Sequence, residues 1–563
     1  MIDSLNPAVI LVIGALLIPI LQGKLRTFYM LLLPVLSFLQ LWMLPAGASA
    51  AFEMFNLTLT TLHIDKLSFV FAVIFHIATF IAVVYSLHLR DSWQQCVNLI
   101  YAGCALGVVL AGDLITLFIY WEMAAISSVF LIWARRTERS YNAGLRYLIV
   151  QIVSGLLLLA GIILYANASG SIEFTKLDLA SPGCVLIFIA FGIKCAFPLF
   201  HSWLVDAYPE ATVTGAVVLS AFTTKMAIYA LARAFPGTEL LIWIGLVMAA
   251  FPIFYAVIEN DLRRVLTYSM INQLGFMVVG IGIGTELALN GTAAHAFADI
   301  LFKGILFMSM GAVLLRTGKM NGSDLGGLYK SMPYTTTFCI IGAASISAFP
   351  LFSAFVTKSL IMEATAREGY KFAWLILLFA SAGVFHHAGI KIPFFAFFAH
   401  DSNIRCKEAP MNMLIAMGIA AILSMAIGIF PETFYKLLPY QVEYNPFTVT
   451  HVITQLQLLL FSALAFTLLL RTGIYPPELH SVNLDVDWLY RKPGAYLAKH
   501  TMSFVATSEK WLFTSIKKLS FIMGARLHRH HGPQGILSKT WPTGSMVMWV
   551  AFLLGPYLIF YYL

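Results

Sequence analysis

The sequence predicts an all-α polytopic membrane protein, and its composition is the main reason. Of its 563 residues, 60% are hydrophobic and only 11% are charged, and the mean hydropathy is +0.84. Nearly all of such a chain must lie in lipid or against other apolar segments. The net charge of +8 does not indicate a nucleic-acid partner, because the basic residues cluster at the ends of apolar runs, where they orient a membrane protein.

Apolar runs of about 17 to 25 residues are long enough to cross a bilayer as helices. The chain contains about sixteen such runs, centred near residues 15, 36, 78, 104, 124, 155, 194, 223, 248, 274, 303, 350, 386, 421, 461 and 553. We expect about 14 core helices, followed by a C-terminal lateral helix and a final span.

The pentapeptide Ala-Phe-Pro-Leu-Phe occurs twice, at residues 196–200 and 348–352. Each proline, Pro198 and Pro350, removes a backbone hydrogen bond and should break its helix. A helix stays broken at membrane depth only where the freed backbone groups face protein or water. The second copy lies in the fifth predicted span after the first, and an odd offset reverses the direction of the chain. The pattern therefore predicts an inverted repeat of two five-helix units, which is typical of transporters.

These patterns divide the chain into five regions. We expect N-terminal spans in residues 1–94, the two five-helix repeats in 95–235 and 237–398, further core spans in 399–472, and an amphipathic lateral helix with a last transmembrane span in 473–563. Lysine and arginine gather in alternate loops, which predicts that both chain termini lie on the outer side of the membrane.

The sequence predicts no cofactor. The six cysteines show no C-x-x-C pattern and no metal-ligand spacing, and we interpret them as small buried residues. No glycine-rich phosphate loop follows a strand. The basic run at 526–531 has no carboxylate or cysteine beside it, so a lipid-facing helix end is a better interpretation than a metal site. A metal site elsewhere is neither predicted nor excluded.

Five ionisable residues fall inside predicted spans, where a charge costs about 2.5–3.5 kcal/mol and normally faces a partner in the protein interior. These residues are Glu122, Lys194, Lys225, Lys303 and Lys358. His295 and Asp299 precede Lys303 at four-residue spacing, so the three share one helix face. Alternating acids and bases at membrane depth are typical of a proton relay. A structural salt bridge is the alternative for any single one of them.

Other ionisable residues lie nearer the ends of the predicted spans. His201 and Asp206 follow the first break, where a mouth or gate and simple loop capping are both open interpretations. Glu363 is either the counter-charge of Lys358 or a residue near the outer surface. A position at the membrane interface is expected for Asp113, Asp261, His386 and His387.

At these residues the chain resembles a known family, the antiporter-like subunits shared by Mrp-type multisubunit sodium/proton antiporters and respiratory complex I. The resemblance runs from about Asp65 to Pro439 and rests on specific motifs. They are Trp121-Glu122, the stretch Lys194-Cys-Ala-Phe-Pro-Leu-Phe-His-Ser-Trp-Leu-Val-Asp206, Lys225, the histidine-bearing helix from His295 to Phe307, and the second broken helix from Phe349 to Lys358. The D-type Mrp subunit is the most similar, because Lys358 takes a place where some complex I relatives carry glutamate. The extended C-terminus from Gly473 is more similar to the large A-type and L-type subunits.

The resemblance implies a proton-translocating subunit of a multisubunit membrane complex, most simply one for sodium/proton antiport. Glu122 and Lys194 would form the first acid and base pair, Lys225 and Lys303 the central relay, and Lys358 the terminal exchange site. Its partners would be other membrane subunits, protons and sodium in a bacterial cytoplasmic membrane. Two alternatives stay open. One is a proton-pumping subunit of a complex I-like or hydrogenase-type redox complex, and the other is the membrane partner of an inorganic-carbon uptake system.

The chain departs from the family pattern at several positions. Val205 stands where proline is usual, Tyr208 and Asp299 where histidine is usual, and Ala354 where glycine is usual. We expect Asp299 to be a close counter-ion for Lys303, because the two are one helical turn apart.

Overall fold

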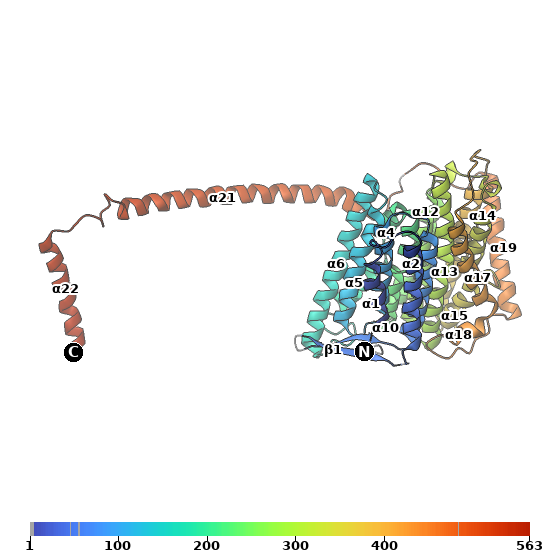
Figure 1. The fold of residues 1–563 in the computed structure, drawn as a ribbon, viewed down its shortest axis with the longest axis horizontal. Helices are drawn as coiled ribbons and strands as arrows, with labels where there is room; N and C mark the ends of the chain where they lie inside the picture. The colour runs from blue at the N-terminus through green and yellow to red at the C-terminus, as the bar shows by residue number, and fades with distance from the viewer. Residues whose placement is uncertain (1–4, 46, 55–56, 482) are drawn as a thin grey trace. The chain divides into compact units, whose positions relative to one another are not determined.

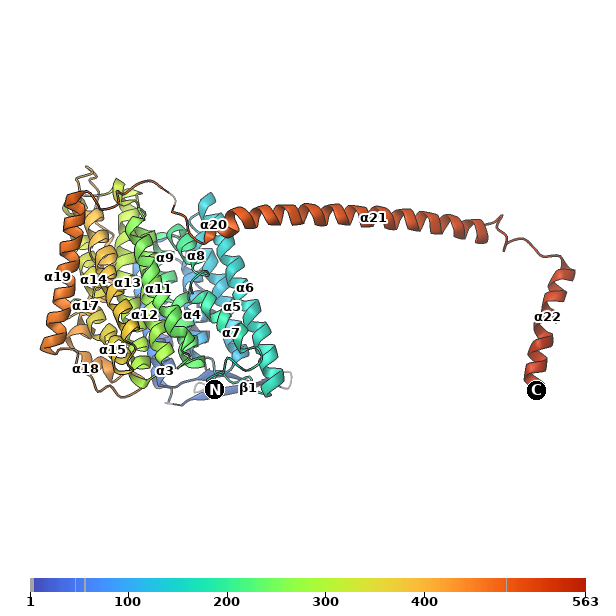
Figure 2. The ribbon, with the colours of Figure 1, turned by 180° about the vertical axis from the view of Figure 1, so that it is seen from behind.

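The computed structural model describes residues 5–45, 47–54, 57–481 and 483–563. They form two compact units, Met1–Asn483 and Leu484–Leu563. In the first unit the helices lie side by side as a bundle, with α6 (Glu138–Ser169) at one flank and α19 (Val449–Thr472) at the other (Figure 1 and Figure 2). Thirteen of the described helices are long and apolar enough to cross a membrane. The prediction of a helical, multi-pass membrane protein is therefore confirmed.

The bundle begins with three helices and a hairpin. The elements are α1 (Pro7–Ala15), α2 (Gly23–Met43), β1 (Ser49–Met54), β2 (Leu57–His63) and α3 (Lys66–Ser86). The two antiparallel strands pair Ser49 with His63, and a bulge lies between Ala50 and Ala51. β1 lies across one end of the bundle, and α18 (Pro431–Tyr435) lies at the same end (Figure 1). The hairpin was not predicted, because its short apolar strands join two membrane helices.

The first five-helix unit contains the first broken helix. Its elements are α4 (Ser92–Leu110), α5 (Leu114–Trp133), α6, the broken pair α7 (Cys184–Lys194) and α8 (Ser202–Ala207), the short turn η2 (Tyr208–Glu210), and α9 (Val213–Ala221) with α10 (Thr223–Ala234). The chain between α7 and α8 is the first Ala-Phe-Pro-Leu-Phe segment with His201, so the helix breaks where the proline predicted it.

The second unit has the same order of helices. Its elements are α11 (Leu240–Ile258), α12 (Leu262–Ile283), α13 (Glu286–Thr317), the turns η3 (Gly322–Asp324) and η4 (Leu328–Lys330), the broken pair α14 (Pro333–Ile346) and α15 (Ser353–Arg367), and α16 (Lys371–Val384). α16 continues into two π-helical segments, η5 (Phe385–Lys391) and η6 (Phe394–Phe398). The bundle then ends with α17 (Met411–Ile429), α18 and α19.

The second compact unit is also helical. It contains α20 (Asp487–Leu489), η7 (Tyr490–Gly494), α21 (Ala495–His531) and α22 (Thr543–Tyr562). α21 is 37 residues long and corresponds to the predicted lateral helix, and α22 is one of the helices apolar enough to cross a membrane.

The predicted spans and the observed helices agree closely. Every predicted centre falls in a helix or, for residue 350, in a helix break. Three predicted spans are absent from the thirteen long apolar helices. One is α1, which has nine residues, and the others are the two broken helices.

The backbone conformation supports the structural equivalence of the two five-helix units. In both copies of the repeated pentapeptide the alanine and the leucine have positive φ, at 62° and 72° for Ala196 and Leu199 and at 57° and 73° for Ala348 and Leu351. Non-glycine residues rarely adopt this left-handed conformation, so its occurrence at the same positions is strong evidence of equivalence. Because five membrane crossings separate equivalent helices, the two units run in opposite directions.

Helix length and capping extend this equivalence. α6 and α13 are the third helices of their units, and each has 32 residues. α5 and α12 are the second helices, and Asp113 and Asp261 cap their N-termini through backbone N–H groups in the first turn. The same two aspartates form isolated bridges to Glu173 and Asn321. Asp113 and Asp261 therefore hold helix ends, as expected for residues at the ends of spans.

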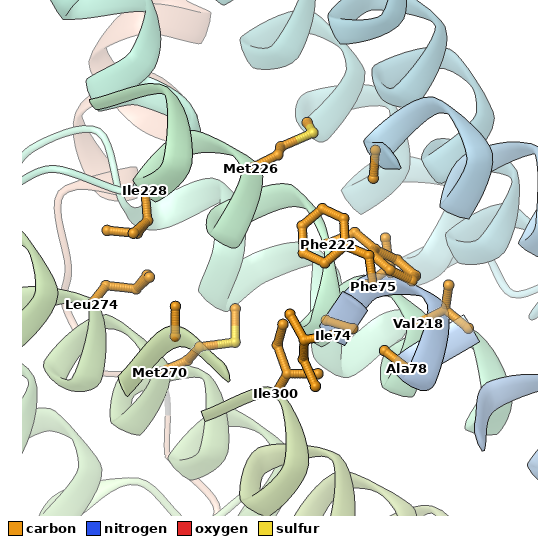
Figure 3. Close-up of a cluster of buried hydrophobic side chains, with 14 of the residues drawn as sticks. Ile74, Phe75, Ala78, Val218, Phe222, Met226, Ile228, Met270, Leu274 and Ile300 are labelled. Carbon is orange, nitrogen blue, oxygen red and sulfur yellow. The ribbon is translucent and has the colours of Figure 1, made fainter. Parts of the chain in front are cut away.

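An apolar cluster fills the place where the two units meet α3 (Figure 3). It is built from α3, α9, α10, α12 and α13 by Ile74, Phe75, Ala78, Val218, Phe222, Met226, Ile228, Met270, Leu274 and Ile300. Met226 follows Lys225 in sequence, and Ile300 follows Asp299. The apolar cluster thus lies beside two of the predicted charged residues.

The positive φ at Ala196 generates a test of the break. Ala196→Val is expected to lower the free energy of unfolding by about 2 kcal/mol, because a β-branched side chain strongly disfavours the left-handed region. Ala196→Gly should change it by less than about 1 kcal/mol, because glycine adopts this conformation without a steric penalty. Thermal unfolding of the purified protein in detergent measures both.

Ala465, an exposed residue inside α19, is the matched control. In a regular helix glycine is less favourable than valine, so the order of the two substitutions should reverse there. If valine were tolerated better than glycine at Ala196, the backbone assigned to this break would be wrong.

Candidate functional site

Buried charged side chains run through both five-helix units. Lys194 ends α7, Lys225 lies in α10, Asp299 and Lys303 lie in α13, and Lys358 lies in α15. All five are between 0% and 3% exposed. In a membrane protein such groups must be satisfied inside the protein, so their contacts define the candidate site.

Lys194 contacts the helix that carries Glu122. Its Nζ donates a hydrogen bond of 2.7 Å to the carbonyl oxygen of Trp121 and lies 4.3 Å from the centroid of that indole ring. The charges of Glu122 and Lys194 interact electrostatically. Glu122 Oε1 is buried and makes no hydrogen bond to any described residue. A Cβ atom at Gly155 of α6 would lie 1.9 Å from this oxygen, so the glycine leaves the space that the carboxylate occupies.

The first break is held by side chains from the α8 side. Trp203 donates through Nε1 to the carbonyl of Ile193 at 2.9 Å, which satisfies an acceptor that the broken helix frees. Asp206 is buried and its Oδ2 forms an ion pair of 2.6 Å with Nε of Arg146 in α6. His201 is also buried, and its ring centroid lies 4.7 Å from that of Phe251 in α11. These contacts are compatible with a structural role of His201 and Asp206 beside the first helix break and also with a gating role.

Lys225 and Asp299 form the central ion pair between the two units. The distance from Lys225 Nζ to Asp299 Oδ2 is 2.6 Å, and both side chains are 0% exposed. Lys225 Nζ also donates to the carbonyl of Ser220 at 3.0 Å. The expected close pair of Asp299 with Lys303 is therefore found only in part, because Asp299 interacts electrostatically with Lys303 but forms its ion pair with Lys225. The packing of α10 against α13 brings Lys225 to Asp299. This contact between helices is shorter than the one from Asp299 to Lys303, which lies one turn later in α13.

Lys303 and His295 are held by neutral polar groups. Lys303 Nζ donates to Ser269 Oγ at 2.6 Å. The His295 ring joins two further helices, with Nε2 3.0 Å from Gln273 Oε1 of α12 and Nδ1 3.0 Å from Thr357 Oγ1 of α15. Gln273 uses its amide nitrogen on Asn272, so its oxygen accepts from His295. The hydroxyl of Thr357 can rotate to donate or accept, so this site accommodates neutral and protonated imidazole.

Lys358 borders a cavity at the second break. Its Nζ lies 3.4 Å from the Ile346 carbonyl and 3.5 Å from Ser381 Oγ, and 4.9 Å from the centroid of the Phe276 ring. The cavity has a volume of about 560 Å³, and its lining includes Lys358, Ser381, Glu363, Arg367, Glu443 and His451. It is large and polar enough to hold several water molecules.

Glu363 lies in the wall of this cavity but does not pair with Lys358. Its Oε1 accepts a hydrogen bond of 2.8 Å from Nε of Arg367, one turn later in α15. Glu363 is therefore paired with Arg367 and is not a directly bonded counter-ion of Lys358.

Two buried cations were missed from the sequence. Arg263 is 1% exposed and donates to the carbonyls of Tyr208, Ala211 and Thr212, which ties the chain after the first break to α12. Lys391 is 0% exposed and lies in the π-helical segment η5. The isoleucines on either side, Ile390 and Ile392, could have indicated from the sequence that Lys391 is buried.

His387 was expected at the membrane interface, but its side chain is 0% exposed.

The described residues contain no group of three or more histidine, cysteine or acidic residues that could hold a metal ion. Five of the cysteines are buried and Cys406 is half-buried.

Comparison with known sequences shows that the charged region is similar to a family model. Residues 111–382 match the sequence model of the family described as NADH:quinone oxidoreductase/Mrp antiporter, transmembrane region. The A-type Na⁺/H⁺ antiporter subunit of Alkalihalophilus pseudofirmus is 29% identical over 425 residues, which cover 66% of this chain and 52% of that protein. Hydrogenase-4 component B of Escherichia coli is 26% identical over 418 residues, which cover 66% of this chain and 62% of that protein. The chain thus spans about half to three-fifths of the length of these relatives.

Solved structures show the same fold. A chain of the Mrp complex from Dietzia sp. DQ12-45-1b superposes with a TM-score of 0.75 at 23% identity, covering 97% of this chain and 61% of that one. A chain of respiratory complex I from Thermus thermophilus superposes with a TM-score of 0.66 at 21% identity, covering 77% of this chain and 98% of that one. The residues that match the family model, 111–382, include Glu122 and the four predicted lysines.

Proposed function

We propose that this chain is a proton-translocating subunit of a multisubunit membrane complex and that it takes part in cation/proton antiport, with sodium as the exchanged cation. The observation that carries the proposal is the series of buried lysines through both units. Three of them, Lys194, Lys303 and Lys358, are held by neutral oxygen atoms rather than by a directly bonded carboxylate. A purely structural lysine in lipid would be expected to have such a carboxylate.

The proposed path follows the chain of contacts. Protons reach Glu122 and Lys194 near the first break, pass the Lys225–Asp299 pair and the His295–Lys303 group, and leave at Lys358 through its cavity. Movement of one charge across 100 mV is worth about 2.3 kcal/mol. A hydrogen bond to a charged group is worth about 1.5–3 kcal/mol. Rearrangement of one lysine contact is therefore enough to load or release a proton.

The chain combines features of two subunit types. Lys358 is the residue that favours the D type, whereas α21 and α22 favour a type with an extended C-terminus, such as the A type. The superposition on a chain of the Mrp complex covers 97% of this chain, which supports the second feature. We infer a lysine series of the D type together with a C-terminal extension of the A type. Its partners are then other membrane subunits of a bacterial cytoplasmic membrane, and both termini lie on the outer side.

A redox-driven pump is the second candidate function. Hydrogenase-4 component B is among the relatives, and complex I shares the fold. In that case electrons would move in partner subunits, and the same series of buried lysines would carry protons. Dependence of proton movement on an added cation or on an electron donor separates the two functions.

Lys194→Ala and Lys358→Ala are each expected to reduce sodium-dependent proton movement by about tenfold or more, because each removes the titratable amine at one step of the path. The measurement is dye dequenching after sodium addition in inverted membrane vesicles from cells that express the full chain with its neighbouring genes. Lys176→Ala and Lys371→Ala change exposed lysines and serve as controls. If transport survived both substitutions at normal protein levels, the relay would be wrong.

Substitutions in the central pair distinguish structure from transport. Asp299→Leu should lower the free energy of unfolding by about 3–5 kcal/mol, because it leaves the Lys225 ammonium buried without its carboxylate. The double variant Lys225→Met/Asp299→Leu should recover most of that stability but not proton movement. Thermal unfolding in detergent and the vesicle assay measure the two properties. A double variant that transported protons like the wild type would show that the pair is only structural.

A further inference from the structure

Lys391 is a buried cation that the proposed path does not use. Its Nζ lies 2.6 Å from the Val257 carbonyl oxygen, 2.7 Å from that of Glu259 and 3.3 Å from that of Ala256, all at the C-terminal end of α11. Free carbonyls at a helix C-terminus carry partial negative charge and attract a cation. The lysine thus neutralises the end of α11.

The fourth partner of Lys391 comes from a distant part of the chain. Glu478 Oε1 lies 2.9 Å from Lys391 Nζ, and both side chains are nearly inaccessible, at 8% and 0% exposed. Glu478 lies in the segment 473–481 that follows α19. This segment returns to the edge of the bundle, where His480 pairs with Asp324 at 3.2 Å.

The environment of Glu478 favours the protonated form of its carboxyl more than water does. Burial raises the pKa of its carboxyl above the ordinary value, and the charge of Glu259 adds to this effect, while Lys391 opposes it. The carboxyl lies outside the membrane-spanning helices, near the loop between α11 and α12 that the basic residues predict to be cytoplasmic. Both of its oxygens are buried, so exchange of a proton with water at that surface needs a small displacement of this side chain.

His387 lies one π-helical turn before Lys391 and faces the interior. It is 0% exposed, and at most one ring nitrogen has a hydrogen-bond partner among the described residues, the backbone of Gly383 one turn earlier. The ring interacts electrostatically with Lys303, His386 and Lys391. A buried imidazole that keeps one nitrogen without a partner is an incompletely satisfied polar group, which normally indicates a functional role or water.

The segment that carries His387 is irregular for an identifiable reason. η5 packs closely against the second break, because a Cβ atom at Gly389 would lie 2.3 Å from Ser347 Oγ. The π-helical register places His387 and Lys391 on the inner side of the same helix as Ser381, the contact of Lys358. Short π-helical segments inside helices occur frequently at functional sites.

We propose that η5 forms a second proton connection, which runs from the edge of the bundle at Glu478 through Lys391 and His387 to Lys303. This inference rests on the proposed function, because it needs Lys303 to carry protons. It adds a branch that reaches the centre without passing Glu122 and Lys194.

Proton transfer along the branch conserves charge at each step. The Lys391 ammonium gives a proton to one ring nitrogen of neutral His387, and the other nitrogen gives its proton to the neutral amine of Lys303. Glu478 then takes a proton from water and returns it to Lys391. Each step breaks one N–H or O–H bond and forms another, and intervening water can bridge the groups.

The test compares two adjacent histidines. His387→Asn should lower the initial rate of sodium-dependent proton movement by about tenfold or more in the inverted vesicles, because it breaks the branch. His386→Asn is the matched control, since His386 stacks on Tyr475 and meets Phe466 edge-on instead, and it should change the rate by less than about twofold. Protein levels and thermal unfolding of both variants are measured alongside.

A second substitution changes Glu478, which lies outside the membrane-spanning helices. Glu478→Gln keeps the size of the side chain and removes its carboxyl, so it should slow transport and flatten the dependence of the rate on the pH outside the vesicle. A merely structural role of Glu478 would lower protein levels without a change in this pH profile.

The outcomes separate the branch from the proposed function. If His387→Asn and Glu478→Gln transport like the wild type while Lys358→Ala abolishes transport, the branch is wrong and the proposed function stands. If Lys358→Ala also transports like the wild type, the proposed function fails and the branch fails with it.

Discussion

One constraint shapes the interior of this bundle: an ammonium group that lies away from water must be held by oxygen atoms of the protein. The structure meets it in two ways. Lys225 and Lys391 each have a carboxylate at ion-pair distance. Lys194, Lys303 and Lys358 are held by carbonyl or hydroxyl oxygens. A carboxylate contact opposes loss of the proton as long as the carboxylate is charged, and a carbonyl or hydroxyl contact opposes it less.

The broken helices follow from the same need, because a helix that stops inside the bundle offers free carbonyls. Ile346, four residues before Pro350, gives its carbonyl to Lys358, which is eight residues after that proline. In the first unit these positions hold Lys194 and Asp206. The repeat thus supplies one backbone shape twice, with the lysine before the break in one copy and after it in the other. Two equivalent backbone segments therefore hold their lysines at different positions relative to the break.

The sequence was sufficient to predict the helices, the two breaks and the five charged positions, because each leaves a local signal of hydropathy, proline or charge. It could not predict which charges meet. Four-residue spacing favoured an Asp299–Lys303 pair, but the packing of α10 on α13 brings Lys225 closer. Lys391 and Glu478 are 87 residues apart in sequence, 478 − 391, and only the return of the segment after α19 joins them. Such pairs depend on tertiary structure, and no periodic pattern in the sequence indicates them.

The pairing of Asp299 with Lys225 has a consequence for Lys303. It leaves Ser269 as the close hydrogen-bond partner of Lys303, and a hydroxyl accepts from an ammonium and donates to an amine with only a rotation. A backbone carbonyl such as that of Trp121, which holds Lys194, can only accept. Lys303 is therefore a position where a proton can come and go with little rearrangement. This property fits a junction at which a path from the first unit and a branch from η5 meet.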